Sequence, residues 1–103
     1  MTMSGTPTTG ASAAGPASAT AANEVSISNF AFLPATVTVR VGTTVTWTNK
    51  DSDAHTVTDK TGTLNSPTLD TGATYRHTFT KPGRYSYLCT IHPFMTATVV
   101  VTP

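Results

Sequence analysis

The chain has 103 residues, a formal net charge of +1 at pH 7 and only 11% charged residues. A nearly neutral chain of this length builds one small core and offers no electrostatic basis for binding nucleic acid or an acidic membrane surface. It has one cysteine and no run of about 18 apolar residues, which excludes an intrachain disulfide and a membrane-spanning helix.

Residues 1–23 carry no charged side chain and consist almost entirely of Thr, Ala, Ser, Gly and Pro. Such a composition buries too little apolar surface to offset the entropy of ordering, so we expect a disordered, flexible tether. The basic and apolar regions of a signal peptide are absent from it. The tether resembles the linker between a processed or lipid-anchored N-terminus and an exported domain, which predicts an extracytoplasmic location, in the periplasm or at the cell surface.

From residue 24 onward, apolar residues alternate with Ser and Thr, at residues 25–28, 36–41 and 44–48. A period of two predicts half-buried strands, and the many Val and Thr residues agree because β-branched side chains suit a pleated sheet. Turn residues such as Gly and Pro separate these runs at short intervals, which favours one β-sandwich domain over residues 24–103. The expected core residues are Val25, Ile27, Val37, Val39, Val45, Trp47, Phe79, Val99 and Val101.

A predicted strand over residues 84–89 is followed by the sequence Cys89-Thr90-Ile91-His92-Pro93-Phe94-Met95, and extended structure resumes at residue 96. A thiol, an imidazole and a thioether thus recur at intervals of three residues in one short loop. Thiolate and thioether sulfurs select copper over harder ions, and zinc rarely recruits Met. A trigonal electron-transfer copper site needs one more His, which leaves His55 and His77 as candidates.

The loop and the run from Asn29 to Asn49, which reads NFAFLPATVTVRVGTTVTWTN, resemble the cupredoxins, the blue copper proteins. Within that family the short loop is most similar to the amicyanin group and then to the plastocyanin group. The resemblance covers residues 24–103 and implies an all-β, Greek-key β-sandwich of two sheets that binds one type 1 copper ion. In the family the first His ligand follows this run by a few residues. The implied metal ligands are His55, Cys89, His92 and, at longer range, Met95.

Other cysteine and histidine chemistries fit less well. A haem attachment motif needs a second Cys before an adjacent Cys-His pair, and the run from Cys89 to His92 lacks both that cysteine and the adjacency. A cysteine hydrolase needs a cleft with a His and an orienting Asn or Asp, which a Cys at the end of a strand does not offer. His77 is in phase with Tyr75 and Phe79, which indicates a structural histidine. Met1 and Met3 stand at the start of the tether and receive no role.

The resemblance implies a one-electron carrier that cycles between Cu(II) and Cu(I), and not an enzyme. The alternative is an extracytoplasmic copper carrier or buffer that delivers copper to another protein. Redox protein partners are expected to dock at an apolar patch around His92, Pro93 and Phe94, with the protein acting as a monomer.

Two positions depart from the family pattern. Thr56 stands where relatives commonly have Asn after the first His ligand, and Ile91 stands where the amicyanin group has Pro. At Thr56 we expect one of two outcomes: the hydroxyl forms a shorter link between the two ligand loops, toward Thr90, or the loops are held less firmly.

Overall fold

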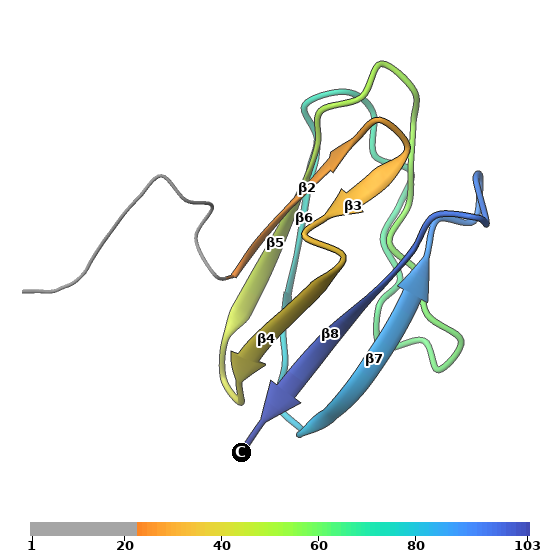
Figure 1. Cartoon of the computed structure of the whole chain (residues 1–103). Helices are drawn as coiled ribbons and strands as arrows, with labels where there is room; N and C mark the ends of the chain where they lie inside the picture. Colours follow the sequence, from red (N-terminus) through yellow and green to blue (C-terminus); the bar gives the residue numbers. More distant parts are fainter. Residues whose placement is uncertain (1–22) are drawn as a thin grey trace, which may run out of the picture.

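The computed structural model describes residues 23–103 (Figure 1), so the tether predicted for residues 1–23 lies, except for Asn23, outside the described residues and stays a prediction. The described part contains seven strands and no helix. No helix within it has the length and apolar character needed to cross a membrane. The strands are β2 (Glu24–Ser28), β3 (Ala31–Leu33), β4 (Thr36–Arg40), β5 (Thr44–Asn49), β6 (Thr74–Thr78), β7 (Gly83–Leu88) and β8 (Thr96–Thr102).

The strands form two sheets, with the orders β3-β2-β5-β6 and β4-β8-β7 (Figure 1). β2 runs parallel to β5, and β4 runs parallel to β8, while the remaining neighbours are antiparallel. These parallel pairs join strands that are not consecutive in the chain, so the connections cross between the sheets. The predicted all-β sandwich of two sheets is confirmed.

The core lies between the sheets, and all nine residues expected there are buried. The alternating pattern placed them correctly because every second side chain of a strand faces the opposite sheet. Other buried residues escaped that pattern: Phe32 on the short strand β3, and Val57, Leu64 and Leu69 in the irregular segment between β5 and β6. This segment, residues 50–73, therefore packs into the core as well as connecting two strands.

Three isolated backbone bridges involve residues 50–73, and two of them position the ligand segments. His55 and Leu69 exchange hydrogen bonds of 3.1 and 2.7 Å, and Thr58 and Leu88 exchange bonds of 3.0 and 2.8 Å. The second bridge ties the segment to the last residue of β7. Because Cys89 follows Leu88 directly, the bridges bring His55 and Cys89 to the same end of the sandwich.

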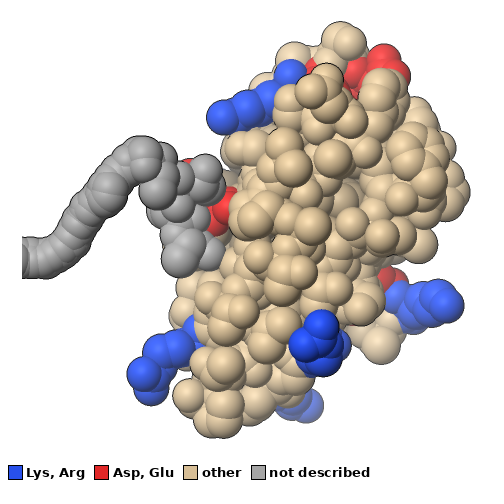
Figure 2. Space-filling view, viewed as in Figure 1, with Lys and Arg blue, Asp and Glu red and all other residues tan. Residues whose placement is uncertain are grey.

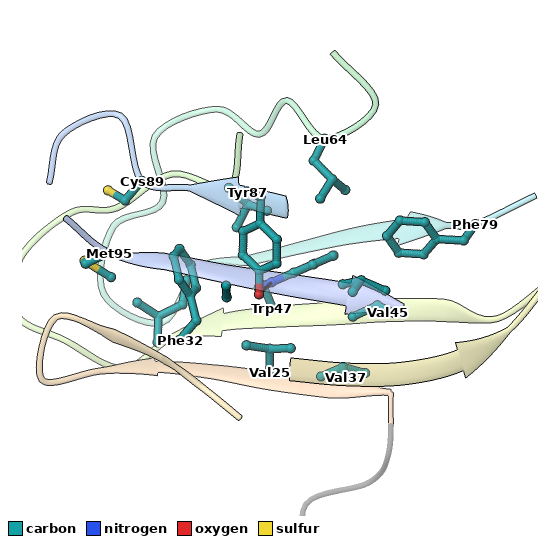
Figure 3. Close-up of a cluster of buried hydrophobic side chains, with 14 of the residues drawn as sticks. Val25, Phe32, Val37, Val45, Trp47, Leu64, Phe79, Tyr87, Cys89 and Met95 are labelled. Carbon is teal, nitrogen blue, oxygen red and sulfur yellow. Dashed lines mark hydrogen bonds between the residues drawn. The ribbon is translucent and has the colours of Figure 1, made fainter. Parts of the chain in front are cut away.

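Two buried aromatic side chains connect the sheets in the middle of the core (Figure 3). Trp47 on β5 donates a hydrogen bond of 3.1 Å from Nε1 to the hydroxyl of Tyr87 on β7, and their rings meet edge to face at 5.7 Å. Burial raises the pKa of Tyr87 to about 12, although the bond from Trp47 opposes that rise. The folded state therefore favours the neutral phenol.

Because the pKa of Tyr87 is raised in the folded state, we expect the free energy of unfolding to fall at high pH. In the unfolded chain the phenol ionises near its ordinary pKa of about 10. Its contribution is therefore fully present below pH 10 and declines as pH rises toward 12, by about 1.4 kcal/mol per pH unit. Urea unfolding of the wild type and Tyr87→Phe at about pH 8 and about pH 11 checks this effect. The free energy of unfolding of the wild type, relative to that of Tyr87→Phe, should be lower at the higher pH. An unchanged difference between the two proteins would contradict it.

Candidate metal centre

Three of the four predicted ligand residues converge at one end of the sandwich. His55 comes from the segment between β5 and β6, Cys89 follows β7, and His92 lies in the loop between β7 and β8. Cys89 Sγ is 3.6 Å from His55 Nδ1 and 3.9 Å from His92 Nδ1, and the two Nδ1 atoms are 3.2 Å apart. One ligand atom from each residue thus lies within 4.8 Å of the other two, as a shared metal ion requires.

Met95 closes the loop that carries the other two ligands. Its backbone N–H donates to the carbonyl of His92 at 2.9 Å, and its carbonyl accepts a 3.1 Å bond from the N–H of Cys89. The side chain is buried, and Figure 3 shows it at the same end of the core as Cys89. This position suits the predicted axial role. His77, by contrast, is on β6, edge-on to Phe79 at 4.7 Å and outside the cluster.

The sulfur of Cys89 is fully buried and has a backbone hydrogen-bond donor. The N–H of Thr56, the residue after His55, donates to Sγ at 3.3 Å. An N–H directed at sulfur stabilises the thiolate, the form that binds a metal. The segment that carries His55 therefore also supplies a hydrogen-bond donor to the sulfur of Cys89.

Thr56 links the two ligand segments through its side chain. Its hydroxyl oxygen accepts a 2.9 Å bond from the N–H of Thr90 and lies 2.9 Å from the Thr90 hydroxyl. The predicted short link from Thr56 to Thr90 is confirmed. The Thr56 hydroxyl therefore holds the two ligand loops together.

Apolar side chains surround the edge of His92, which is partly exposed. Phe94 and Ile91 expose 72% and 46% of their surface, and Phe30, from the turn between β2 and β3, exposes 41%. Together with the exposed Pro93, these residues form what we call the apolar rim. Sequence reasoning missed Phe30, because no turn was predicted at residues 29–30.

Asp51 was also missed as part of the site. Its Oδ2 lies 2.8 Å from His55 Nε2, the ring nitrogen that faces away from the cluster. Burial raises the pKa of Asp51, but hydrogen bonds from Phe30, His55 and Asn29 lower it by more, so its pKa lies below the ordinary value. The side chain is therefore an ionised acceptor at neutral pH.

The donor set fits copper. It combines a buried sulfur with two imidazole nitrogens, and a thioether lies in the same loop. Softness of the sulfur ligands favours copper, and imidazole suits both of its oxidation states. A site for a hard cation requires carboxylate or other oxygen ligands. Among the described residues, no carboxylate belongs to this cluster.

Comparisons with known proteins agree with this geometry. The family profile of the cupredoxin-like domain matches residues 2–101. Amicyanin-alpha of Methylorubrum extorquens is 40% identical over 83 residues, 76% of this chain and 70% of that relative. Amicyanin of Paracoccus denitrificans is 43% identical over 68 residues, which cover 61% of this chain but only 52% of that relative.

Solved structures show the same fold. The crystal structure of amicyanin from Paracoccus versutus is 34% identical and superimposes with a TM-score of 0.73, covering 79% of this chain and 81% of that one. The reduced Cu(I) form of an amicyanin variant at pH 4 is 37% identical with a TM-score of 0.74, covering 82% and 85%. The fold, the ligand cluster and these relatives together show that the chain belongs to the cupredoxin family, with the amicyanins among its relatives.

Proposed function

We propose that this protein is a small type 1 copper protein that carries one electron between redox partners. The observation that supports it most is the convergence of one Cys sulfur and two His nitrogens within 4.8 Å at the end of the sandwich. When bound there, copper supplies a one-electron Cu(II)/Cu(I) couple. In this proposal the protein acts as an electron carrier.

In this proposal His55, Cys89 and His92 hold the metal, and Met95 lies at longer range. The Nδ1 atoms of both histidines point toward the sulfur, which leaves their Nε2 atoms free for other contacts. The Met95 thioether is buried. It lies in the loop that is closed by the backbone hydrogen bonds of Met95 with His92 and Cys89. A thiolate with two imidazoles and a weak axial thioether is the ligand set of electron-transfer copper.

The scaffold holds the ligands in a fixed arrangement. The bridges at Thr58 and Leu88, the Thr56–Thr90 link and the closed loop from Cys89 to Met95 restrain every segment that carries a ligand. Cu(I) and Cu(II) prefer different geometries, so ligands that move little between the two states lower the barrier to electron transfer. Rigidity is thus the contribution of the chain to the reaction.

The apolar rim is the proposed docking surface for redox protein partners. It surrounds the ligand nearest to solvent, His92, so a docked partner comes close to the metal position. A small apolar contact favours brief association and fast release. On the face shown in Figure 2, most Lys and Arg side chains lie near the outline and one lies on the lower part of the face, and a broad uncharged area lies above it. We propose that the carrier acts as a monomer outside the cytoplasm.

Retention of the metal favours electron transfer over copper delivery. Cys89 and His55 have no exposed surface, so a copper-accepting protein could not reach these ligands directly. A delivery protein would instead present its ligands to the acceptor.

Electrochemistry of the copper-loaded protein tests the proposed function. We expect a reversible one-electron couple and full retention of copper over repeated cycles, even in the presence of a Cu(I) chelator at equal concentration. Irreversible waves, or loss of the metal to the chelator on reduction, would favour copper delivery instead.

A further inference from the structure

The carboxylate of Asp51 joins the turn between β2 and β3 to the segment that carries His55. Its Oδ1 accepts a hydrogen bond of 2.7 Å from the N–H of Asn29, and its Oδ2 accepts one of 2.9 Å from the N–H of Phe30. Oδ2 also lies 2.8 Å from His55 Nε2. Two adjacent amides and one ligand imidazole therefore share a single side chain.

The contact with Asp51 determines which nitrogen of His55 carries the proton. The Asp51 carboxylate already accepts two backbone N–H bonds and serves as an acceptor here too, so the hydrogen of the Nε2–Oδ2 contact lies on Nε2. The Nδ1 atom of a neutral His55 then keeps its lone pair, and this atom lies 3.6 Å from Cys89 Sγ. With the proton on Nε2, His55 can bind a metal ion through Nδ1.

Asp51 also stabilises an unusual turn between β2 and β3. Asn29 and Phe30 have φ values of +53° and +56°, the left-handed region that favours glycine. Positive φ at both central residues of a two-residue hairpin is the pattern of a type I′ turn, in which Gly usually occupies the position of Phe30. The two N–H groups of such a turn can bind one anion, and Asp51 supplies it.

The strained turn places an aromatic ring on both histidines. The ring of Phe30 lies 5.6 Å from that of His55 and 5.1 Å from that of His92, edge-on in both cases. Glycine would relieve the backbone but remove these contacts. The ring thereby covers the side of His92 that faces the turn.

We propose that Asp51 is a positioning residue that fixes His55 with Nδ1 toward the metal and, through the turn it binds, holds Phe30 against His92. The copper role of this arrangement rests on the proposed function. The arrangement itself belongs to the metal-free chain, so it can be tested without copper.

The first test is a long-range proton–nitrogen NMR spectrum of the metal-free wild type at mildly alkaline pH. We expect His55 to carry its proton on Nε2, with nuclear Overhauser contacts between the rings of Phe30 and His92. A His55 proton on Nδ1 would overturn the proposal without any variant.

The second test compares Asp51→Asn with Asp53→Asn. The amide introduced by Asp51→Asn would offer one acceptor oxygen to three N–H groups, so His55 is expected to move its proton to Nδ1 and to accept a bond from the amide. Cu(I) affinity, measured by chelator competition, should then fall by about 10- to 100-fold. Asp53 has an exposed side chain in the same loop, so its variant loses the same charge and should retain the wild-type tautomer and affinity.

Phe30→Gly separates the two effects of Asp51. Glycine adopts positive φ without strain, so this variant should keep the turn and the Nε2 tautomer of His55 but lose the ring over His92. If Asp51→Asn alone does not fold, the double variant with Phe30→Gly provides the tautomer test in a turn that no longer needs the carboxylate.

Equal tautomer and Cu(I) affinity in Asp51→Asn and Asp53→Asn would contradict the proposal while leaving the copper function intact. A wild type that gives no thiolate–copper absorption, but shows the Nε2 tautomer and its loss in Asp51→Asn, would instead overturn the copper function and leave the positioning role of Asp51 standing.

Discussion

Replacing Cys89 by Ser is expected to abolish the intense visible absorption of the copper-loaded protein and to lower its copper affinity by at least about 100-fold. Loss of a residue that only hydrogen-bonds to a ligand costs up to about 100-fold in metal affinity, and loss of a ligand should cost at least as much. The thiolate is the ligand that makes the site selective for copper, and a serine hydroxyl is a harder, weaker donor. Cys89 is fully buried and is the single cysteine of the chain, so no other thiol can take its place. Visible absorption and chelator competition measure both effects.

His77→Asn is the matched control for this substitution. It removes an imidazole, a side chain of the kind that binds metals, from the same domain. His77 lies on β6, outside the ligand cluster. Absorption and affinity should remain those of the wild type. Loss of the absorption in His77→Asn, or its survival in Cys89→Ser, would show that the copper ligands are wrongly assigned.

Replacing Trp47 by Ala is expected to destabilise the metal-free protein by about 3–5 kcal/mol. Trp47 is fully buried, contacts the rings of Tyr75 and Tyr87, and donates a hydrogen bond to Tyr87. Alanine leaves a cavity between the sheets and removes that donor. Small domains have a total stability of about 5–15 kcal/mol, so the variant should be close to unfolding.

Urea unfolding of the metal-free protein measures this loss, and Trp47→Phe is the control. Phenylalanine retains much of the apolar volume and should cost clearly less than alanine. A loss below about 1 kcal/mol for Trp47→Ala would mean that the core collapses around the gap, contrary to the close packing we infer.

The strands and the central core followed from the sequence because alternation directly reports which face of a strand is buried. Val25 and Val45 illustrate this, since each is flanked by Ser, Thr or Glu and each is buried. Leu64 and Leu69 could not be placed in this way. They lie in an irregular segment whose burial depends on backbone bridges to distant residues, which have no period in the sequence.

The metal centre was predictable to different degrees. Cys89, His92 and Met95 share one short loop, so spacing and ligand softness were enough to suggest copper. His55 was chosen over His77 through the resemblance to the cupredoxins and because His77 is in phase with two aromatic residues of its strand. The structure places His55 beside Cys89 Sγ. Asp51 and Phe30 had no such signal, because their roles depend on a turn that meets the ligand segment only in the folded chain.

Copper titration of the wild-type protein, followed by visible absorption, tests the central claim most directly. The account predicts an intense thiolate-to-copper band in the visible that grows with added Cu(II) and saturates at one copper ion per chain. A colourless complex, or binding without saturation at one equivalent, would contradict the type 1 copper site.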